Sequence, residues 1–410
     1  MSKPRRVLIA LCLLLAGLGV ARPAAAIDVR GRSSTQYLWY NDIVDGSKQS
    51  QLAEYLSFSM NGIDNANKLS VQGYGRATYQ LQKADADTNS AFDDRLYYLY
   101  ADYKGLTDQV DVRFGRQFVN LSAGSALIDG VQADIKKLSL VGVTLMGGRD
   151  IQFGERGALT SHAYSAGMAI YLMGVKNTDL DVSYYRAYDY SDVARDMLGF
   201  NFKQFLLDSM KLYTNARYDL TAQVLSEVLV GIKYFPQLDL MLTAEHFESY
   251  PTFDTTSIFS VFAVDRYKEN VLKADLTALS WLDVNAGIIQ ETYGEGGDAK
   301  VYELGLRVRP SHSFTVGASY DKRTGYGGDL NGVKTYAEYS DLKKLKVAAG
   351  IDYDIYQRDE MTGEETAKKY WASARYHFTK QMSSSLRVED NVNANYSKDL
   401  KGRATFDVDF

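Results

Sequence analysis

The segment "LSVQGYGRATYQL", from Leu69 to Leu81, decides the fold class of this chain. Apolar or small residues occupy every second position, and polar residues such as Gln72 and Arg76 fall between them. Successive side chains of a β-strand point to opposite faces, so this pattern predicts a strand with one apolar and one polar face. The segment is longer than a typical soluble strand of about five or six residues. It is long enough for the roughly 9–11 residues that a tilted strand needs to cross a bilayer.

The same alternation recurs along the chain, for example in "VDVRFGRQF" (110–118), "LKVAAGIDYDI" (345–355) and "YWASARYHF" (370–378). The 31 tyrosines agree with it, because tyrosine favours strands and membrane interfaces. Placing such segments end to end predicts 22 strands, at 28–40, 51–61, 68–82, 94–104, 110–118, 128–136, 139–147, 162–175, 179–188, 194–205, 210–218, 223–235, 238–249, 269–278, 282–293, 300–309, 313–322, 332–340, 345–357, 368–378, 382–393 and 399–410.

The predicted connections alternate between short and long. Short ones include "NTD", "FPQ", "SHS" and "TKQ", whereas "QKADADTNSAFD", "RDIQFGERGALT" and the region 250–268 are longer and mostly polar. Short turns at one end and longer loops at the other are typical of bacterial outer-membrane barrels, which have an even number of strands. The pattern therefore predicts an all-β fold, a transmembrane antiparallel up-and-down β-barrel of about 22 strands, within a range of 16–22.

A barrel fixes which side chains face inward. Lipid offers no partner for backbone N–H and C=O groups, so strands can span it only when the sheet closes on itself. Charged side chains on the lipid face are destabilising near the midplane, and we therefore expect them on the opposite face. Aromatic residues near strand ends are expected in girdles at the two membrane interfaces, but Trp371 has inward parity. It either fills space in the lumen or indicates a register that is shifted by one residue. The candidate lumen-lining residues are Arg76, Arg113, Arg217, Arg307, Arg375, Asp111, Glu303, Asp352 and Asp354.

The first 26 residues have the pattern of a secretory signal. Basic residues in "MSKPRR" precede the apolar run "VLIALCLLLAGLGVA", and "RPAAA" offers small residues for cleavage after Ala26. The alternative is an uncleaved anchor helix, although the apolar run is short for a membrane span. We expect residues 27–410 to form a single barrel domain, since no linker-like composition interrupts them.

Composition excludes several function classes. The only cysteine, Cys12, lies in the predicted signal, so residues 27–410 can form no disulfide and no CxxCH haem attachment. The four histidines have no metal-ligand spacing. Without the signal, 42 basic residues stand against 51 acidic ones, which argues against nucleic-acid binding. We predict no catalytic, metal or cofactor site.

The chain ends with "FDVDF", in which Phe406, Val408 and Phe410 alternate with aspartates. Together with the signal and the strand rhythm, this ending resembles a Gram-negative outer-membrane porin over nearly all of 27–410. The resemblance implies that the terminal residues form an insertion signal read by the barrel assembly machinery, and that the last strand pairs with the first, around "DVRGRSSTQYLWY". It also implies the bacterial outer membrane as the location and its lipid as a partner.

The resemblance implies a channel for passive diffusion of small hydrophilic solutes or ions. The segment "NLSAGSALIDG" (120–130) is small and apolar enough to fold inward as a constriction, or it forms an ordinary external loop. The alternative is a barrel sleeve around a multihaem cytochrome, in the manner of porin–cytochrome conduits. Self-association as a trimer is a further expectation. An enzyme is disfavoured, because Glu245 and His246 are neighbours on one strand and point to opposite faces.

Overall fold

The computed structural model describes residues 27–41, 46–64, 66–82, 91–138, 140–151, 162–173, 175–252, 265–342, 344–358, 363–395 and 397–410. These ranges contain 22 strands and no helix long and apolar enough to cross a membrane. The predicted signal, residues 1–26, lies outside the described part of the chain, as do most of the longer loops.

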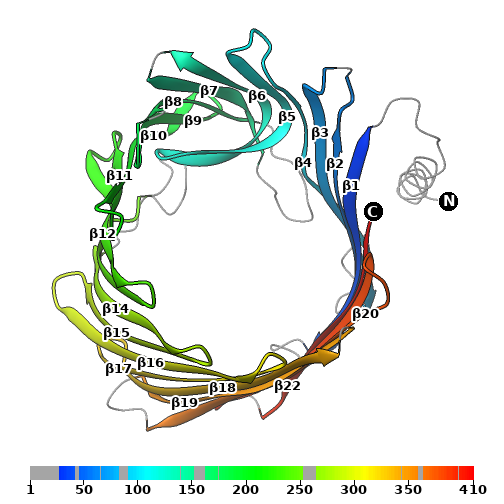
Figure 1. Ribbon diagram of the computed structural model, residues 1–410, viewed down its shortest axis with the longest axis vertical. Coiled ribbons are helices and arrows are strands. Elements are labelled where there is room, and N and C mark those ends of the chain that lie inside the picture. Colours follow the sequence, from blue (N-terminus) through cyan, green and yellow to red (C-terminus); the bar gives the residue numbers. More distant parts are fainter. Residues whose placement is uncertain are drawn as a thin grey trace.

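All 22 strands belong to one antiparallel sheet in which each strand pairs with its neighbours in the sequence, and β1 also pairs with β22. The sheet therefore closes into a ring with a wide centre (Figure 1). The strands are β1 Asp28–Asn41, β2 Lys48–Asn61, β3 Leu69–Gln82, β4 Phe92–Tyr103, β5 Val110–Leu121, β6 Gly124–Leu138, β7 Val141–Asp150, β8 Ala163–Leu172, β9 Thr178–Asp189, β10 Asp192–Leu206, β11 Met210–Asp219, β12 Val224–Gln237, β13 Leu240–Ser249, β14 Tyr267–Leu279, β15 Leu282–Tyr293, β16 Gly297–Ser311, β17 Phe314–Gly325, β18 Asp329–Leu342, β19 Leu345–Gln357, β20 Glu365–His377, β21 Met382–Val392 and β22 Asp399–Asp409.

The predicted fold class and strand number are confirmed. Connections from even to odd strands form one end of the barrel, here called the short-turn end, where β1 begins and β22 ends. Connections from odd to even strands form the long-loop end, which holds the segments after β3, β7 and β13 that the sequence predicts to be long. The alternating connection lengths thus correspond to the two ends.

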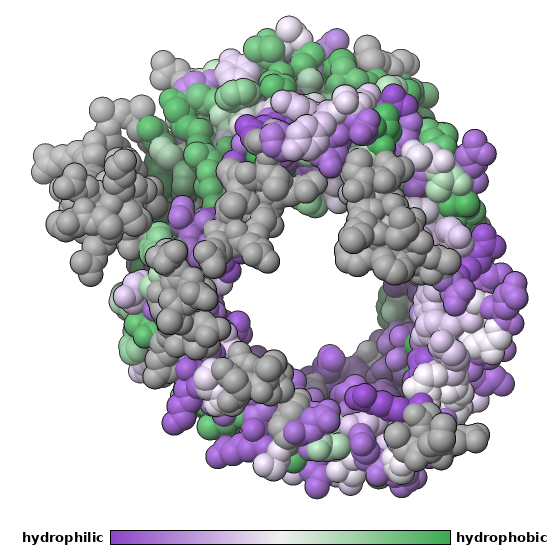
Figure 2. Space-filling view, turned by 180° about the vertical axis from the view of Figure 1, so that it is seen from behind, coloured by the Kyte–Doolittle hydropathy of each residue, from purple (hydrophilic) through white to green (hydrophobic). Residues whose placement is uncertain are grey.

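Side-chain parity divides the wall into an apolar outer face and a polar inner face. On β15 and β16, Ile288, Leu304 and Leu306 are 44–51% exposed although they lie within continuous strands, and they occupy the outer face. The inner face carries the ion pairs described below. In Figure 2 the hydrophilic side chains border the open centre, while much of the hydrophobic colouring lies on the outside of the ring. The wall here is therefore a single layer, and many of its outer apolar side chains are partly exposed.

The hairpin formed by β5 and β6 departs from this single layer. It curves across the inside of β7–β10, so that two layers of strand face each other there (Figure 1). The sequence predicts strands ending at 118 and resuming at 128, and this boundary is wrong. β5 runs to Leu121 and β6 starts at Gly124, because the two strands stay paired over the infolded part.

Candidate channel lining

The infolded hairpin packs on the inner wall through a small hydrophobic core. Val119 and Leu121 of β5 and Ile128 of β6 are 0–7% exposed. With Ala123 and Ala126 they form a cluster with wall residues such as Tyr185 of β9 and Met197 of β10. Burying side chains of this size contributes roughly 1.5–3 kcal/mol each, so the hairpin is firmly seated. Of the two possibilities for 120–130, the inward constriction is the one found.

Polar contacts fix the hairpin turn to the wall. The hydroxyl of Ser183 on β9 lies 2.7 Å from the Ser122 hydroxyl and accepts the Ala123 backbone N–H at 2.7 Å. Arg217 of β11 donates through Nε to the Ser122 carbonyl at 3.1 Å and pairs with Glu227 at 3.1 Å. The turn thus satisfies its backbone groups with side chains from two separate wall strands, which determines where it sits in the lumen.

Glycine makes the close approach possible. An added Cβ at Gly199 on β10 would lie 2.0 Å from the Ala123 backbone nitrogen and 2.1 Å from the Ser122 carbonyl carbon. Both atoms belong to the backbone, so no side-chain rotation could relieve the clash. The absence of a side chain at residue 199 is therefore a condition for the observed position of the turn.

The hairpin leaves the wall at a second glycine. Gly115 has φ +123°, a conformation that residues with a side chain rarely adopt, and an added Cβ would meet the Leu99 carbonyl oxygen at 2.5 Å. One residue later, β5 stops pairing with β4: their ladder covers five residue pairs, from Tyr103↔Val112 to Leu99↔Arg116. The Arg116 side chain continues the contact by donating to the Leu96 carbonyl at 3.1 Å. Its guanidinium also makes two hydrogen bonds to Asp129 at 2.8 Å each.

The predicted lumen residues lie on the inner face, where most of them form ion pairs between nearby strands. The positions of individual side chains were left open by the sequence, and the structure shows that they meet in opposite-charge pairs rather than in rings of one sign. The pairs are Arg76–Asp93 at 2.8 Å, Arg113–Asp102 at 3.0 Å, Arg217–Glu227 at 3.1 Å, Lys273–Glu303 at 3.0 Å, Arg307–Asp283 at 3.9 Å, Lys369–Asp352 at 4.0 Å and Lys136–Asp111.

The remaining predicted lumen residues also have inward parity. Asp354 lies opposite Gly332, where an added Cβ would come within 2.5 Å of its carboxylate oxygen. Arg375 lies opposite Lys346 and Ser385. Trp371, which the alternation left unexplained, shares the inner face: its ring covers Gly350, and the Arg387 guanidinium lies 4.6 Å from the ring centroid. The predicted register is therefore correct at this strand.

Tyrosines gather at two places on the inner face. On β2–β4, Tyr74 stacks against Tyr55 and Tyr97, with ring centroids 6.4 and 4.9 Å away. Next to them the Arg113 guanidinium lies 4.5 Å above the Tyr100 ring. A second group near the long-loop end brings Tyr267, Tyr293 and Tyr326 together, with centroids 5.0 and 5.2 Å apart. The sequence analysis linked tyrosine to strands and membrane interfaces, and these two groups lie on strands but face the lumen.

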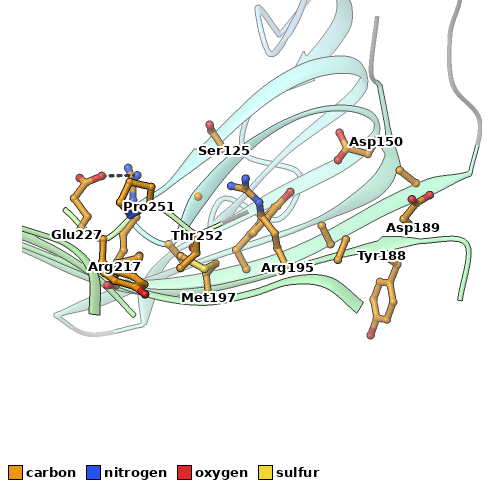
Figure 3. A pocket seen from close by; sticks show the side chains of 18 of the residues that line it. Ser125, Asp150, Tyr188, Asp189, Arg195, Met197, Arg217, Glu227, Pro251 and Thr252 are labelled. Carbon is orange, nitrogen blue, oxygen red and sulfur yellow. Dashed lines mark hydrogen bonds and ion pairs between the residues drawn. The ribbon is translucent and has the colours of Figure 1, made fainter. Parts of the chain in front are cut away.

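A polar pocket of about 630 Å³ lies between the hairpin turn and the long-loop ends of β7–β13. Figure 3 shows Arg217 and Glu227 joined at one side, Asp150 and Asp189 at the other, and Arg195 between them. Both signs of charge thus line one recess beside the constriction. Among the residues that the structure describes, no group of His, Cys, Asp and Glu side chains could hold a metal ion.

The last strand closes the barrel as predicted. β22 pairs with β1 from Arg32↔Asp409 to Trp39↔Gly402, and Gly31 and Phe410 exchange backbone hydrogen bonds of 2.9 and 3.0 Å. Phe406 and Phe410 lie on the outer face and are 38% and 42% exposed, and Val408 shares their parity. The Phe410 ring covers Gly31, where an added Cβ would lie 2.5 Å from it. Reading of Phe406, Val408 and Phe410 by assembly machinery stays a prediction.

The pair considered for catalysis is separated by the wall. Glu245 of β13 faces inward, where the Tyr213 hydroxyl donates to it. His246 faces outward and lies 2.8 Å from the Asn270 side-chain oxygen. These two residues cannot form a dyad.

No protein-family model matches this chain, and no curated protein matches its sequence. Solved structures do match its fold. The chain is similar to Acinetobacter baumannii OccAB2, with a TM-score of 0.51 and 10% identity over 94% of this chain and 98% of that one. It is also similar to Pseudomonas aeruginosa OpdK with vanillate, with a TM-score of 0.50 and 11% identity over 93% and 98%. A BenF-like porin from Pseudomonas fluorescens Pf-5 matches with a TM-score of 0.50 and 10% identity over 93% and 98%. The barrel fold implied by the porin resemblance is thereby confirmed.

The sequence contained one overlooked signal for the hairpin. In β5 the apolar residues Val110, Val112 and Phe114 have even numbers, whereas the buried ones beyond Gly115, Val119 and Leu121, have odd numbers. This switch at Gly115 indicates that the apolar side chains of β5 change from the outer face of the strand to its inner face. The anchors Ser183 and Gly199, on distant strands, had no comparable signal.

Proposed function

We propose that this protein is an outer-membrane porin, a water-filled channel for passive diffusion of small hydrophilic solutes or ions. The observation that carries the proposal is a closed ring of strands with an apolar outside, a charged inside and a hairpin folded into the lumen. An apolar band suits lipid, and a polar lumen suits water. The porin and Occ folds among the solved structures support the same function.

The orientation follows from the two ends. Short turns face the periplasm and longer loops face the outside in barrels of this kind, so we place the short-turn end, with Phe410, on the periplasmic side. The hairpin then narrows the channel from the long-loop side. Because the charges of the inner wall meet in opposite-sign pairs, we propose weak selectivity between small cations and anions.

A sleeve for a multihaem cytochrome is the less well supported alternative. The similar solved structures with porin names favour a channel, and the hairpin takes up part of the lumen. We also propose that the protein is not an enzyme, since Glu245 and His246 point to opposite faces.

The test is conductance of the purified, haem-free protein in planar lipid bilayers. We expect stepwise current increases that scale with salt concentration, and entry of small sugars into proteoliposomes. Absence of conductance from folded, heat-modifiable barrels, or co-purification with a haem-staining protein that blocks it, would contradict the porin function.

A further inference from the structure

Four aromatic rings form a continuous row on the inner face at the long-loop end of β13–β17, here called the aromatic row. Successive ring centroids lie 6.1, 5.0 and 5.2 Å apart, in the order Phe247, Tyr267, Tyr293 and Tyr326. The inward parity of Tyr267 follows from Lys273, which lies on the same face of β14 and pairs with the lumen residue Glu303. The row therefore lines the channel and not the membrane side of the wall.

The aromatic row lies at the mouth of the channel. Tyr267 begins β14, Tyr293 ends β15 and Tyr326 directly follows β17, all at the long-loop end. The infolded hairpin crosses β7–β10, so the row is on the side of the lumen that the hairpin leaves open (Figure 1). In the orientation proposed above, a solute entering from outside reaches this row first. The inference below rests on the proposed function, because only a channel presents such a mouth to solutes.

Hydrogen bonds hold two of the rings in place. The Tyr267 hydroxyl donates to Glu269 at 2.5 Å, and the Tyr293 hydroxyl donates to Glu291 at 3.2 Å. Each carboxylate is two residues away on the same strand, so each ring lies along its own strand instead of projecting across the lumen. Rings that are already fixed lose little conformational freedom when a ligand settles on them, which favours binding.

The rings of the aromatic row keep part of their faces uncovered. Neighbouring ring planes are tilted by 58°, 50° and 31°, and the ring residue at the end of the row, Tyr326, is 56% exposed. The tyrosines around Tyr74 differ, because the Tyr74 plane lies within 20° of the planes of Tyr55 and Tyr97 and these rings stack on one another. An aromatic face carries a partial negative charge. It therefore attracts the weakly positive C–H groups of a saturated ring such as that of a sugar.

Charged groups of both signs border the aromatic row. Arg323 pairs with Glu291 and donates to the Tyr326 carbonyl at 3.0 Å, while Glu269 lies one strand further along. A hydroxyl group is both donor and acceptor, so a sugar can use the carboxylates and the guanidinium alike. An anionic solute would be repelled by the two glutamates. An organic cation would compete with Arg323, whose guanidinium already lies 5.9 Å from the Tyr293 ring centroid.

We infer that the aromatic row is a binding site for neutral saccharides at the mouth of the channel. The ring faces hold the C–H side of the sugar, and Glu269, Glu291 and Arg323 hold its hydroxyl groups. The row extends over three centroid separations of 5.0–6.1 Å and is longer than one sugar ring. A short oligosaccharide therefore contacts several rings at once and binds more tightly than a monosaccharide.

Calorimetric titration of the folded, purified protein with maltotriose tests this site, in an ethoxylated detergent that carries no sugar headgroup. We expect saturable binding of maltotriose and weaker binding of glucose. Tyr267→Ala and Tyr293→Ala should each weaken maltotriose binding at least about fivefold, because each removes one ring face. Tyr267→Phe keeps the ring and should bind more tightly than Tyr267→Ala. Tyr302→Ala, on the outer face of β16, is the matched control and should bind as wild type does.

Absence of maltotriose binding would overturn the inference, and so would binding that survives both alanine substitutions. Tighter binding of choline chloride than of maltotriose would also overturn it, since the row would then select a cation. If an alanine variant does not assemble, Tyr267→Leu and Tyr293→Leu remove the ring but keep an apolar side chain, and they should weaken binding in the same way. The titration does not depend on conductance. A channel that conducts but binds no maltotriose refutes the saccharide site alone, whereas a barrel that binds maltotriose but does not conduct refutes the channel alone.

Discussion

Replacing Gly199 by alanine should displace the turn of the infolded hairpin, Ser122 and Ala123, from the wall. The new methyl carbon would lie 2.0 Å from the Ala123 backbone nitrogen. Ordinary non-bonded contacts are optimal at roughly 3.5–4.0 Å, so the turn must retreat by about 1.5 Å or more. That shift stretches the 2.7 Å hydrogen bond from Ala123 to Ser183 and the 3.1 Å bond from Arg217 to the Ser122 carbonyl.

A comparison of free energies indicates that the turn moves and that the wall strand β10 stays in place. Overpacking of this kind costs about 1–3 kcal/mol. The two stretched hydrogen bonds contribute about 0.5–1.5 kcal/mol each, so losing them is comparable to that cost. β10, in contrast, is paired on both sides of residue 199, with β11 from Met197 to Leu206 and with β9 from Asp192 to Gln204. We therefore expect an intact barrel with a mobile turn, and a less constricted lumen.

Single-channel recording in planar bilayers measures the effect. Gly199→Ala should give a larger or noisier open-channel current than wild type, and a cysteine introduced at Ser125 should react faster with a water-soluble thiol reagent. Gly147→Ala is the matched control, since its methyl group would meet its nearest neighbour at an ordinary 3.8 Å. Identical current, noise and labelling in wild type and Gly199→Ala would refute the reasoning. If Gly199→Ala does not assemble, Ser183→Ala removes the same anchor without a clash and should give the same direction of change.

Two further changes probe the lumen and the closing strand. Asp102→Asn leaves Arg113 without the carboxylate that lies 3.0 Å away, so the reversal potential in a KCl gradient should shift towards that of chloride. The control Asp298→Asn, on the outer face, should leave the reversal potential unchanged. Equal shifts in both variants would contradict the placement of Asp102 in the lumen. Phe410→Ala uncovers Gly31 and should destabilise the closed barrel by about 1–2 kcal/mol, less than a fully buried ring because Phe410 is 42% exposed. A lower midpoint of urea unfolding would show the loss of stability. Reduced recovery of folded protein from the outer membrane would support the predicted insertion signal. Unchanged values in both measurements would refute both the stabilising role and the signalling role of Phe410.

Much of the fold could be predicted from the local alternation of apolar and polar residues. The alternation in segments such as Leu69–Leu81 was sufficient to predict strands, their inner and outer faces and their number, because a period of two leaves no other regular structure. Closure between β22 and β1 followed from the requirement that no strand edge remain unpaired in lipid. The inward parity of Arg113 and Trp371 followed from the same period.

The position of the β5–β6 hairpin was decided only by tertiary structure. Its sequence left open whether 120–130 folds inward as a constriction or forms an external loop, and the choice depends on Ser183, Gly199 and Arg217, which lie about 60–100 residues away in the chain. The charge pairs of the lumen likewise depend on which strands become neighbours and in which register. The sequence by itself determined the strands of the wall and their inner and outer faces, because the alternation of apolar and polar residues is a local pattern. Only the folded barrel determined what narrows its lumen, because that contact joins residues distant in sequence.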